Sequence, residues 1–431
     1  MHANRLTLIA ALTLTFFTVS FAQSSSSPKR KKIKDFGSSL KRLKWNPEKN
    51  AVEVNAPGTE LDEGDVIRID TSLVTSELMV LDERGNPVSG LTAEDFSVSE
   101  DGAPQTVGHF LKGDNANVPR TIVLIIDYSG SQLPFIKNSV NAAKLLVDKL
   151  GPKDLMAIVT DDVELIVDFT ADKKQLKKKL DSLLEKTRMD TGVFPSIFGP
   201  RMRLGRSWQY SALMATLNEA FNKEEDVRPI IIFQTDGDEA YSLKNSIMDL
   251  TVPYGLEGEA RAQAEASIAF QQRARLKDGP QFSLDDLYRA VEKSRVTLYT
   301  VVPGIKLTGL TTEERYEKYD AHIRTRFKDR YREDYDSRIL RRWYAERTAK
   351  LQHALSGVAP LTGGWTEFLE TPDQADAIYS RIFSDINQRY IIGYYPTNKE
   401  RDGKRRKIDF AVKGHPEYQV YGRRSYFAPS F

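Results

Sequence analysis

Apolar runs and amphipathic stretches alternate through the middle of the chain. The runs suited to buried strands are "TIVLIID", "LMAIVT", "VELIVDF", "PIIIFQTD" and "RVTLYTVV". Between them, stretches such as "FIKNSVNAAKLLVDKL" and "ADAIYSRIFSDIN" carry apolar residues at the i, i+3, i+4 spacing of helices. Strand and helix in turn predict an α/β fold over residues 119–390: a Rossmann-like, doubly wound, mostly parallel sheet with helices on both faces.

Shorter alternating segments flank this region. Residues 64–112 and 391–431 read as short strands that are separated by turn signals such as "ERGNP", "EDG" and "TNKERDGK". Each flank alone is too small to bury much apolar surface. We therefore expect the two flanks to pack together as one small β-sandwich beside the central domain.

The first 63 residues have a different composition. Residues 1–22 hold a basic residue followed by "LTLIAALTLTFFTVSFA", which is typical of an export signal. An uncleaved anchor is the alternative, because a membrane-spanning helix needs ~20 apolar residues. Residues 23–63 begin with "QSSSSPKRKKIK" and predict a flexible linker. We expect an exported chain, periplasmic or extracellular, with no stable membrane span after signal cleavage.

The composition excludes several kinds of chemistry. The formal charge of +2 over 431 residues gives no overall attraction to nucleic acid, and no nucleic-acid partner is expected. The absence of cysteine excludes thiolate catalysis and cysteine-ligated zinc. The five histidines lie far apart and form no metal-ligand spacing. We therefore expect each histidine to be a surface or structural residue.

Oxygen-bearing side chains follow two of the predicted strands. Asp127, Ser129 and Ser131 come after "IVLII", and Asp236 and Gly237 come after "PIIIFQT". Sheets of this class bind ligands at the carboxyl ends of their strands. Carboxylate and hydroxyl oxygens suit a hard divalent cation, Mg²⁺ or otherwise Mn²⁺ or Ca²⁺. Either motif alone is equally consistent with a helix N-cap, but two such exits in one sheet favour a site.

Three segments carry a family resemblance. "IIDYSGS", "GRSWQYSAL" and "IIIFQTDG" resemble the von Willebrand factor type A domain and its metal-ion-dependent adhesion site. The flanking segments resemble the related proteins of Acidobacteria. The resemblance implies metal ligands at Asp127, Ser129, Ser131 and Asp236. It implies a further hydroxyl ligand at Ser207, where the family usually has threonine, with Ser211 as the alternative.

The resemblance also implies a function. We expect an exported, non-catalytic binding or adhesion protein whose cation accepts an acidic group of a protein ligand. One alternative is a scaffold in which the β-sandwich and a charged helix make the contacts and the metal is only structural. A remote alternative is a magnesium-dependent phosphatase, since Asp127 sits where such enzymes place a nucleophile. That family needs a second aspartate two residues later, where this chain has Ser129.

Two insertions enlarge the predicted domain. Residues 239–282 follow Asp236 and should project from the metal face. In residues 305–350, apolar and aromatic side chains recur every four positions from Ile323 to Trp343. This spacing predicts one long helix with a slowly drifting apolar stripe, which either packs on the domain or meets a partner.

Overall fold

A mostly parallel sheet forms the centre of the molecule. The computed structural model describes residues 32–54, 73–112, 118–190, 207–221, 228–246, 251–326, 328 and 331–430. In this part of the chain the central sheet has the order β12-β11-β10-β7-β8-β9. Its strands are β7 (Arg120–Ile126), β8 (Leu155–Thr160), β9 (Leu165–Thr170), β10 (Arg228–Gln234), β11 (Thr297–Pro303) and β12 (Thr366–Leu369). Only the edge strand β9 pairs antiparallel with its neighbour.

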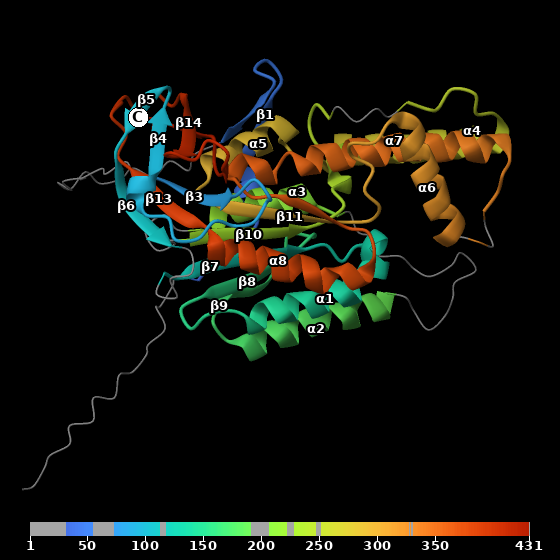
Figure 1. Cartoon of the computed structure of the whole chain (residues 1–431). Helices are drawn as coiled ribbons and strands as arrows, with labels where there is room; N and C mark the ends of the chain where they lie inside the picture. Colours follow the sequence, from blue (N-terminus) through green and yellow to red (C-terminus); the bar gives the residue numbers. More distant parts are fainter. Residues whose placement is uncertain are drawn as a thin grey trace, which may run out of the picture.

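Helices cover both faces of this sheet (Figure 1). One face carries α1 (Leu133–Asp148), α2 (Lys173–Asp190) and α8 (Ala375–Gln388), and the other carries α3 (Gln209–Glu219), α5 (Leu284–Lys293) and α7 (Tyr335–Ser356). Along β7, Leu124 points into the first core and Val123 into the second, as the alternation of side chains in a strand requires. The predicted doubly wound fold is confirmed.

The two flanks form a β-sandwich. One sheet has the order β15-β3-β13-β6 and the other β16-β14-β4-β5. The strands are β3 (Val74–Leu81), β4 (Phe96–Glu100), β5 (Ala103–Gln105), β6 (Val107–Lys112), β13 (Tyr390–Tyr394), β14 (Arg405–Val412), β15 (Gln419–Tyr421) and β16 (Ser425–Phe427). Leu78, Phe96, Ile392 and Ile408 are buried in one core between these sheets. The sandwich predicted as part of the fold class is confirmed.

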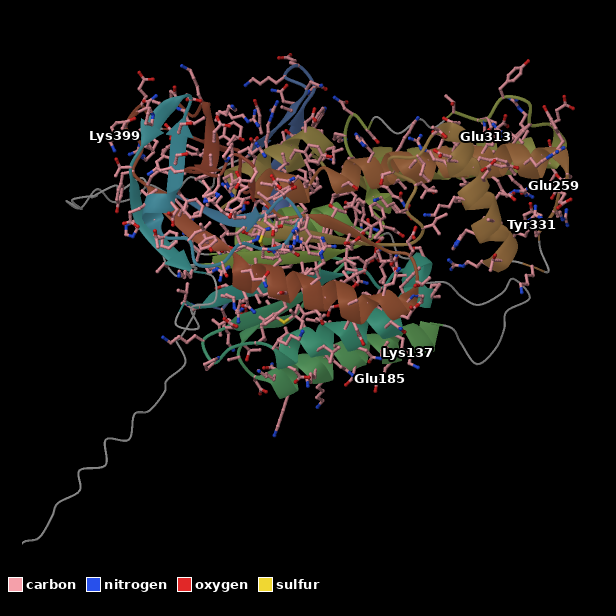
Figure 2. All side chains as sticks on the ribbon, in the orientation of Figure 1. Lys137, Glu185, Glu259, Glu313, Tyr331 and Lys399 are labelled. Carbon is pink, nitrogen blue, oxygen red and sulfur yellow. The ribbon has the colours of Figure 1, made fainter. Side chains whose placement is uncertain are left out.

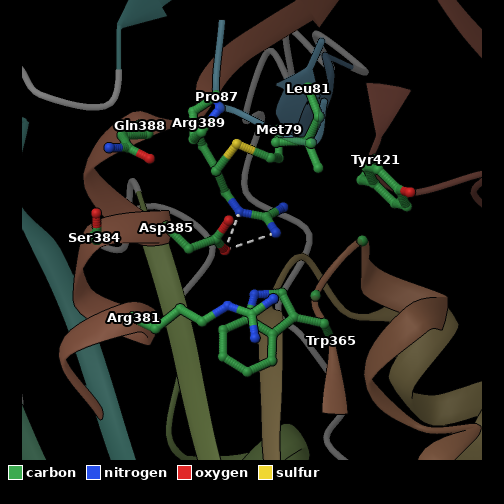
Figure 3. A pocket seen from close by; sticks show the side chains of 13 residues that line it. Met79, Leu81, Pro87, Trp365, Arg381, Ser384, Asp385, Gln388, Arg389 and Tyr421 are labelled. Atoms are coloured by element: carbon green, nitrogen blue, oxygen red, sulfur yellow. Dashed lines mark hydrogen bonds and ion pairs between the residues drawn. The ribbon is translucent and has the colours of Figure 1, made fainter. Parts of the chain in front are cut away.

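Buried charges join the sandwich to the central sheet. Arg228, the first residue of β10, donates two hydrogen bonds of 2.9 and 3.0 Å to the carboxylate of Glu77 in β3. Arg389, directly after α8, pairs with Asp385 at 2.9 Å. Figure 3 shows this pair in a cavity of about 540 Å³ at the same seam, with Trp365 below it. The two units are therefore held together by buried polar contacts.

Gly364 allows the chain to pass close to β11 at this seam. A Cβ atom on Gly364 would lie 1.7 Å from the carbonyl oxygen of Leu298. No other residue type fits at that position without moving a strand of the central sheet.

Part of the predicted linker is folded, so the prediction of a flexible segment over 23–63 is wrong for residues 32–54. They contain η1 (Ser38–Arg42), β1 (Leu43–Asn46) and β2 (Ala51–Val54). The backbone N–H groups of Gly37 and Ser39 donate to the Glu219 carboxylate at 2.8 and 2.7 Å. Leu43 is buried in the core beneath α3 and α5. The basic and serine-rich composition of this segment predicted a linker, although its few apolar residues pack on the domain.

The long helix predicted over the second insertion is also wrong. The structure has two helices, α6 (Thr312–Arg326) and α7, which pack on each other. Asp334 interrupts the run because its side chain accepts a hydrogen bond of 2.9 Å from the backbone of Ser337, an N-cap that starts a new helix. In the first insertion lie η4 (Asp238–Tyr241) and α4 (Gly258–Asp278).

The β-sandwich and α6 lie toward opposite ends of the molecule. Figure 2 shows Lys399 of the sandwich at one end and Tyr331, next to α6, at the other. The remaining short helices are η2 (Ala93–Asp95), η3 (Gly130–Gln132), η6 (Ala359–Thr362) and η7 (Pro372–Gln374). The predicted export signal, residues 1–22, lies outside the described residues. Among the residues that are described, no helix is long and apolar enough to cross a membrane.

Candidate metal centre

The ends of β7 and β10 bring two distant motifs together. These strands are parallel neighbours, with Ile126 opposite Gln234. The backbone N–H of Asp127 donates to the carbonyl of Gln234 at 3.0 Å, which extends the pairing by one residue. The segments that begin at Asp127 and Thr235 therefore leave the sheet at the same level.

Four of the predicted ligands meet at this edge. The Ser129 and Ser131 hydroxyl oxygens are 3.0 Å apart, and Ser131 donates to Oδ2 of Asp236 at 2.5 Å. Asp127 is buried and accepts a 2.9 Å hydrogen bond from the backbone N–H of Ser129. Asp127 and Asp236 are bridged by the Gln209 amide, whose Nε2 lies 3.2 and 3.4 Å from their oxygens. The structure thus brings the two strand-exit motifs into one oxygen-rich cluster.

The two carboxylates of the cluster repel each other. Burial, followed by the negative charges of Asp236 and Asp161, raises the pKa of Asp127 well above its ordinary value. A buried carboxylate in this position needs a proton, a hydrogen-bond donor or a cation. Thr235 supplies one donor, since its hydroxyl donates to Asp127 at 3.1 Å.

The predicted hydroxyl ligands from the intermediate segment have other contacts. Ser207 donates to the carboxylate of Asp161 at 2.7 Å. Ser211 donates to the buried Glu239 through both its backbone N–H and its hydroxyl. No contact found among the described residues joins either serine to Asp127. Asp161 links the two regions, because its other oxygen accepts from the backbone of Tyr128 at 3.3 Å.

Two glutamines of the site were missed by the sequence reasoning. Gln132 directly follows Ser131, is buried, and donates to Asp236 at 2.8 Å. Gln209 starts α3, two residues after Ser207. Their adjacency to the motif serines was the available signal. Gly237, directly after Asp236, has a φ of 77°, a left-handed conformation that glycine adopts without steric cost.

The donor set fits a hard divalent cation. In the described part of the chain, no group of three or more His, Cys, Asp or Glu side chains is placed to hold a metal. Hydroxyl oxygens therefore have to contribute, and Ser129 and Ser131 are next to Asp236. A cation at this cluster would offset both the burial and the repulsion that raise the pKa of Asp127. Oxygen ligands of this kind suit Mg²⁺, Mn²⁺ and Ca²⁺ alike.

The chain is similar to several solved structures. The vWF domain of the type V pili tip protein Mfa5 from Porphyromonas gingivalis is 15% identical, over 63% of this chain and 95% of that one, with a TM-score of 0.32. The manganese-loaded TRAP protein of Plasmodium vivax is 13% identical, over 76% and 97% of the two chains, with a TM-score of 0.26. For an aerotolerance-related membrane protein from Bacteroides fragilis the identity is 15%, the coverages are 63% and 100%, and the TM-score is 0.27.

These similarities are too weak to transfer a function, since every one of these TM-scores is below 0.5. No protein-family model matches the chain, and no curated protein matches it. The resemblance to proteins of Acidobacteria has no counterpart among these findings. The structure itself shows a doubly wound sheet with the two motifs at the ends of neighbouring parallel strands, as the sequence predicts.

Proposed function

We propose that the protein is an exported, non-catalytic binding protein that uses a divalent cation to bind an acidic group of a protein ligand. The observation that carries the proposal is the cluster of Asp127, Ser129, Ser131 and Asp236 at one edge of the sheet. When bound, the cation would supply a coordination position for a carboxylate oxygen of the partner. The carboxylates of Asp127 and Asp236 would balance the charge of the cation, and the hydroxyl groups of Ser129 and Ser131 would supply further oxygen ligands.

Ser207 has a supporting role in this proposal. Its hydroxyl orients Asp161, which in turn accepts a hydrogen bond from the backbone next to Asp127. Gln209 holds the two carboxylates at a fixed separation, and Gln132 orients Asp236. These contacts pre-organise the oxygens, which reduces the entropy that a ligand would otherwise lose when the site is ordered.

The arrangement gives little support to a hydrolase. Ser129 occupies the position where a phosphatase of the aspartyl-nucleophile type needs its second carboxylate. The scaffold alternative, in which a metal only stabilises the fold, makes a different prediction. In that case EDTA would lower the melting temperature and leave partner binding intact.

Direct metal titration tests the proposal. Isothermal titration with Mg²⁺ and Mn²⁺ should show one site in the wild type and none in Asp127→Ala, with circular dichroism showing that both are folded. Asp148→Ala is a matched control, because Asp148 is exposed at the end of α1 and pairs with Lys177. Binding of an extracellular partner that persists in EDTA would contradict a metal-bridged mechanism.

A further inference from the structure

The second insertion forms one wall of a cavity beside the metal centre. The cavity has a volume of about 320 Å³. Ser131 and Asp236 of the oxygen cluster line it together with Tyr319, His322 and Arg326 from α6. Figure 1 shows α6 across the end of α7, away from the β-sandwich. A ligand that reaches the cluster from this side therefore meets α6 first.

The wall is fixed in place by polar contacts. Arg315 of α6 pairs with Glu346 of α7 at 2.9 Å, and Lys318 pairs with Glu370 after β12 at 2.6 Å. Gln352 of α7 holds the loop after β11 through hydrogen bonds of 2.7 and 2.8 Å to its backbone. One such pair at a surface contributes little, but these contacts tie α6 to two separate elements. The cavity is thus a built part of the fold.

The lining combines apolar side chains with charges of both signs. Asp236 and Asp238 line the cavity beside the oxygen cluster, and Arg326 lines it from α6. Phe135 and Leu351 are buried side chains that line the cavity. Burial, and then the charge of Arg326, lowers the pKa of His322, so this histidine is neutral at pH 7. Arg326 is exposed and supplies a lasting positive charge. A ligand that suits this lining has a short apolar stem and a negative group at the Arg326 end.

An unused acceptor points to a peptide. Gln132 is 1% exposed and lines the cavity, and its Nε2 is committed to Asp236. Its Oε1 is buried and accepts no hydrogen bond from the residues that the structure describes. Buried acceptors are rarely left in this state unless a ligand or water completes them. A backbone N–H of a bound peptide is a donor of the right kind.

We propose that this cavity receives an acidic peptide segment that carries two carboxylates. One carboxylate faces the cation cluster, the second meets Arg326, and a peptide N–H donates to Gln132. The proposal rests on the proposed function and names the chemical class of its ligand. A cavity of this size is near the lower end of the ~300–1,000 Å³ typical of ligand pockets. It accommodates a side chain and its backbone, and excludes a flat protein surface.

Small acids test the proposal without a known partner. N-acetylglutamate has two carboxylates and one amide N–H, N-acetylglutamine lacks the side-chain carboxylate, and glutarate lacks the N–H. In excess Mg²⁺, titration calorimetry should show N-acetylglutamate binding to the wild type about fivefold more tightly than either analogue, as a single ion pair or hydrogen bond of about 1 kcal/mol implies. In EDTA all three should bind weakly.

Two matched substitutions on α6 locate the second carboxylate. Arg326→Gln should remove the preference for N-acetylglutamate over N-acetylglutamine. Arg324→Gln should retain it, because Arg324 is on the same helix but pairs with Asp320 and does not line the cavity. Both side chains are exposed, so neither change endangers folding.

A separate Mn²⁺ titration followed by electron paramagnetic resonance distinguishes the two levels of the proposal. If Mn²⁺ binds but N-acetylglutamate is not preferred, or if Arg326→Gln behaves like the wild type, the peptide proposal is overturned and the metal centre stands. If Mn²⁺ does not bind, the proposed function fails, and the assignment of this ligand class fails with it.

Discussion

Breaking the ion pair between Glu77 and Arg228 should destabilise the protein by several kcal/mol. The Arg228 side chain is 1% exposed and that of Glu77 is 11% exposed, so loss of one partner leaves a buried charge. Such losses typically cost about 3–5 kcal/mol. The two single changes should differ, because Arg389 also acts on Glu77.

The direction of this difference follows from the neighbouring charges. Glu77→Leu removes the carboxylate with which both buried arginines, Arg228 and Arg389, interact, and should cost about 5 kcal/mol. Arg228→Met leaves Glu77 in the field of Arg389 and should cost about 3 kcal/mol. The double variant removes both charges and fills similar volumes, so it should cost less than the sum by about 2–3 kcal/mol.

Urea denaturation of the four proteins at pH 7, analysed as a double-mutant cycle, measures these values. Burial alone would raise the pKa of Glu77, but the charge and hydrogen bonds of Arg228 hold it below its ordinary value of 4.5. The contribution of the pair is therefore complete above pH 4.5 and is lost as the pH falls through the pKa of the folded state. Single variants that each cost under 1 kcal/mol and add in the double variant would refute this account.

Three further predictions concern the metal centre and the core. Mg²⁺ at 100 times its Kd should increase the free energy of unfolding of the wild type by about 2.7 kcal/mol. It should therefore raise the melting temperature of the wild type but not that of Asp127→Asn. Burial raises the pKa of Glu239 to about 8, so its stabilising contribution is complete below pH 4.5 and is lost as the pH rises to about 8. Glu239→Gln should remove this loss of stability when urea denaturation is measured across that pH range. A pH profile identical to that of the wild type would contradict the prediction. Gly364→Ala should cost about 3 kcal/mol or more, or prevent folding, because of the clash with Leu298; a near-wild-type urea midpoint would contradict it.

The strand-exit part of the site was predictable because it depends on short-range pattern. An apolar run that ends in Asp127 or Asp236 identifies a strand and its carboxyl end at once. Parallel pairing of neighbouring strands then forces the two ends together, whatever the connecting helices do. The fold class was predictable for the same reason, because apolar strand segments that alternate with amphipathic helix segments indicate a parallel sheet covered by helices.

The rest of the site depends on contacts that no local pattern encodes. Gln209 reaches both carboxylates because of where α3 begins, and Ser207 turns to Asp161 from the segment before it. The α6 wall was hidden by a periodicity of four that continues through the break at Asp334. An N-cap at that position was readable, but one aspartate in a run rich in charges carries little weight.

The architecture separates the stability of the molecule from its proposed binding. The ion pair of Arg228 lies at the amino end of β10, where the sandwich packs, whereas Asp236 follows the carboxyl end of the same strand. The contacts described for the two ends share no side chain, so substitutions there should have additive effects on the free energy of unfolding. The sandwich can thus serve as a rigid base, and the α6 end can vary with the ligand. If Arg228→Met weakened Mg²⁺ binding as strongly as Asp127→Ala, the strand would be transmitting strain between its ends, and this separation would be wrong.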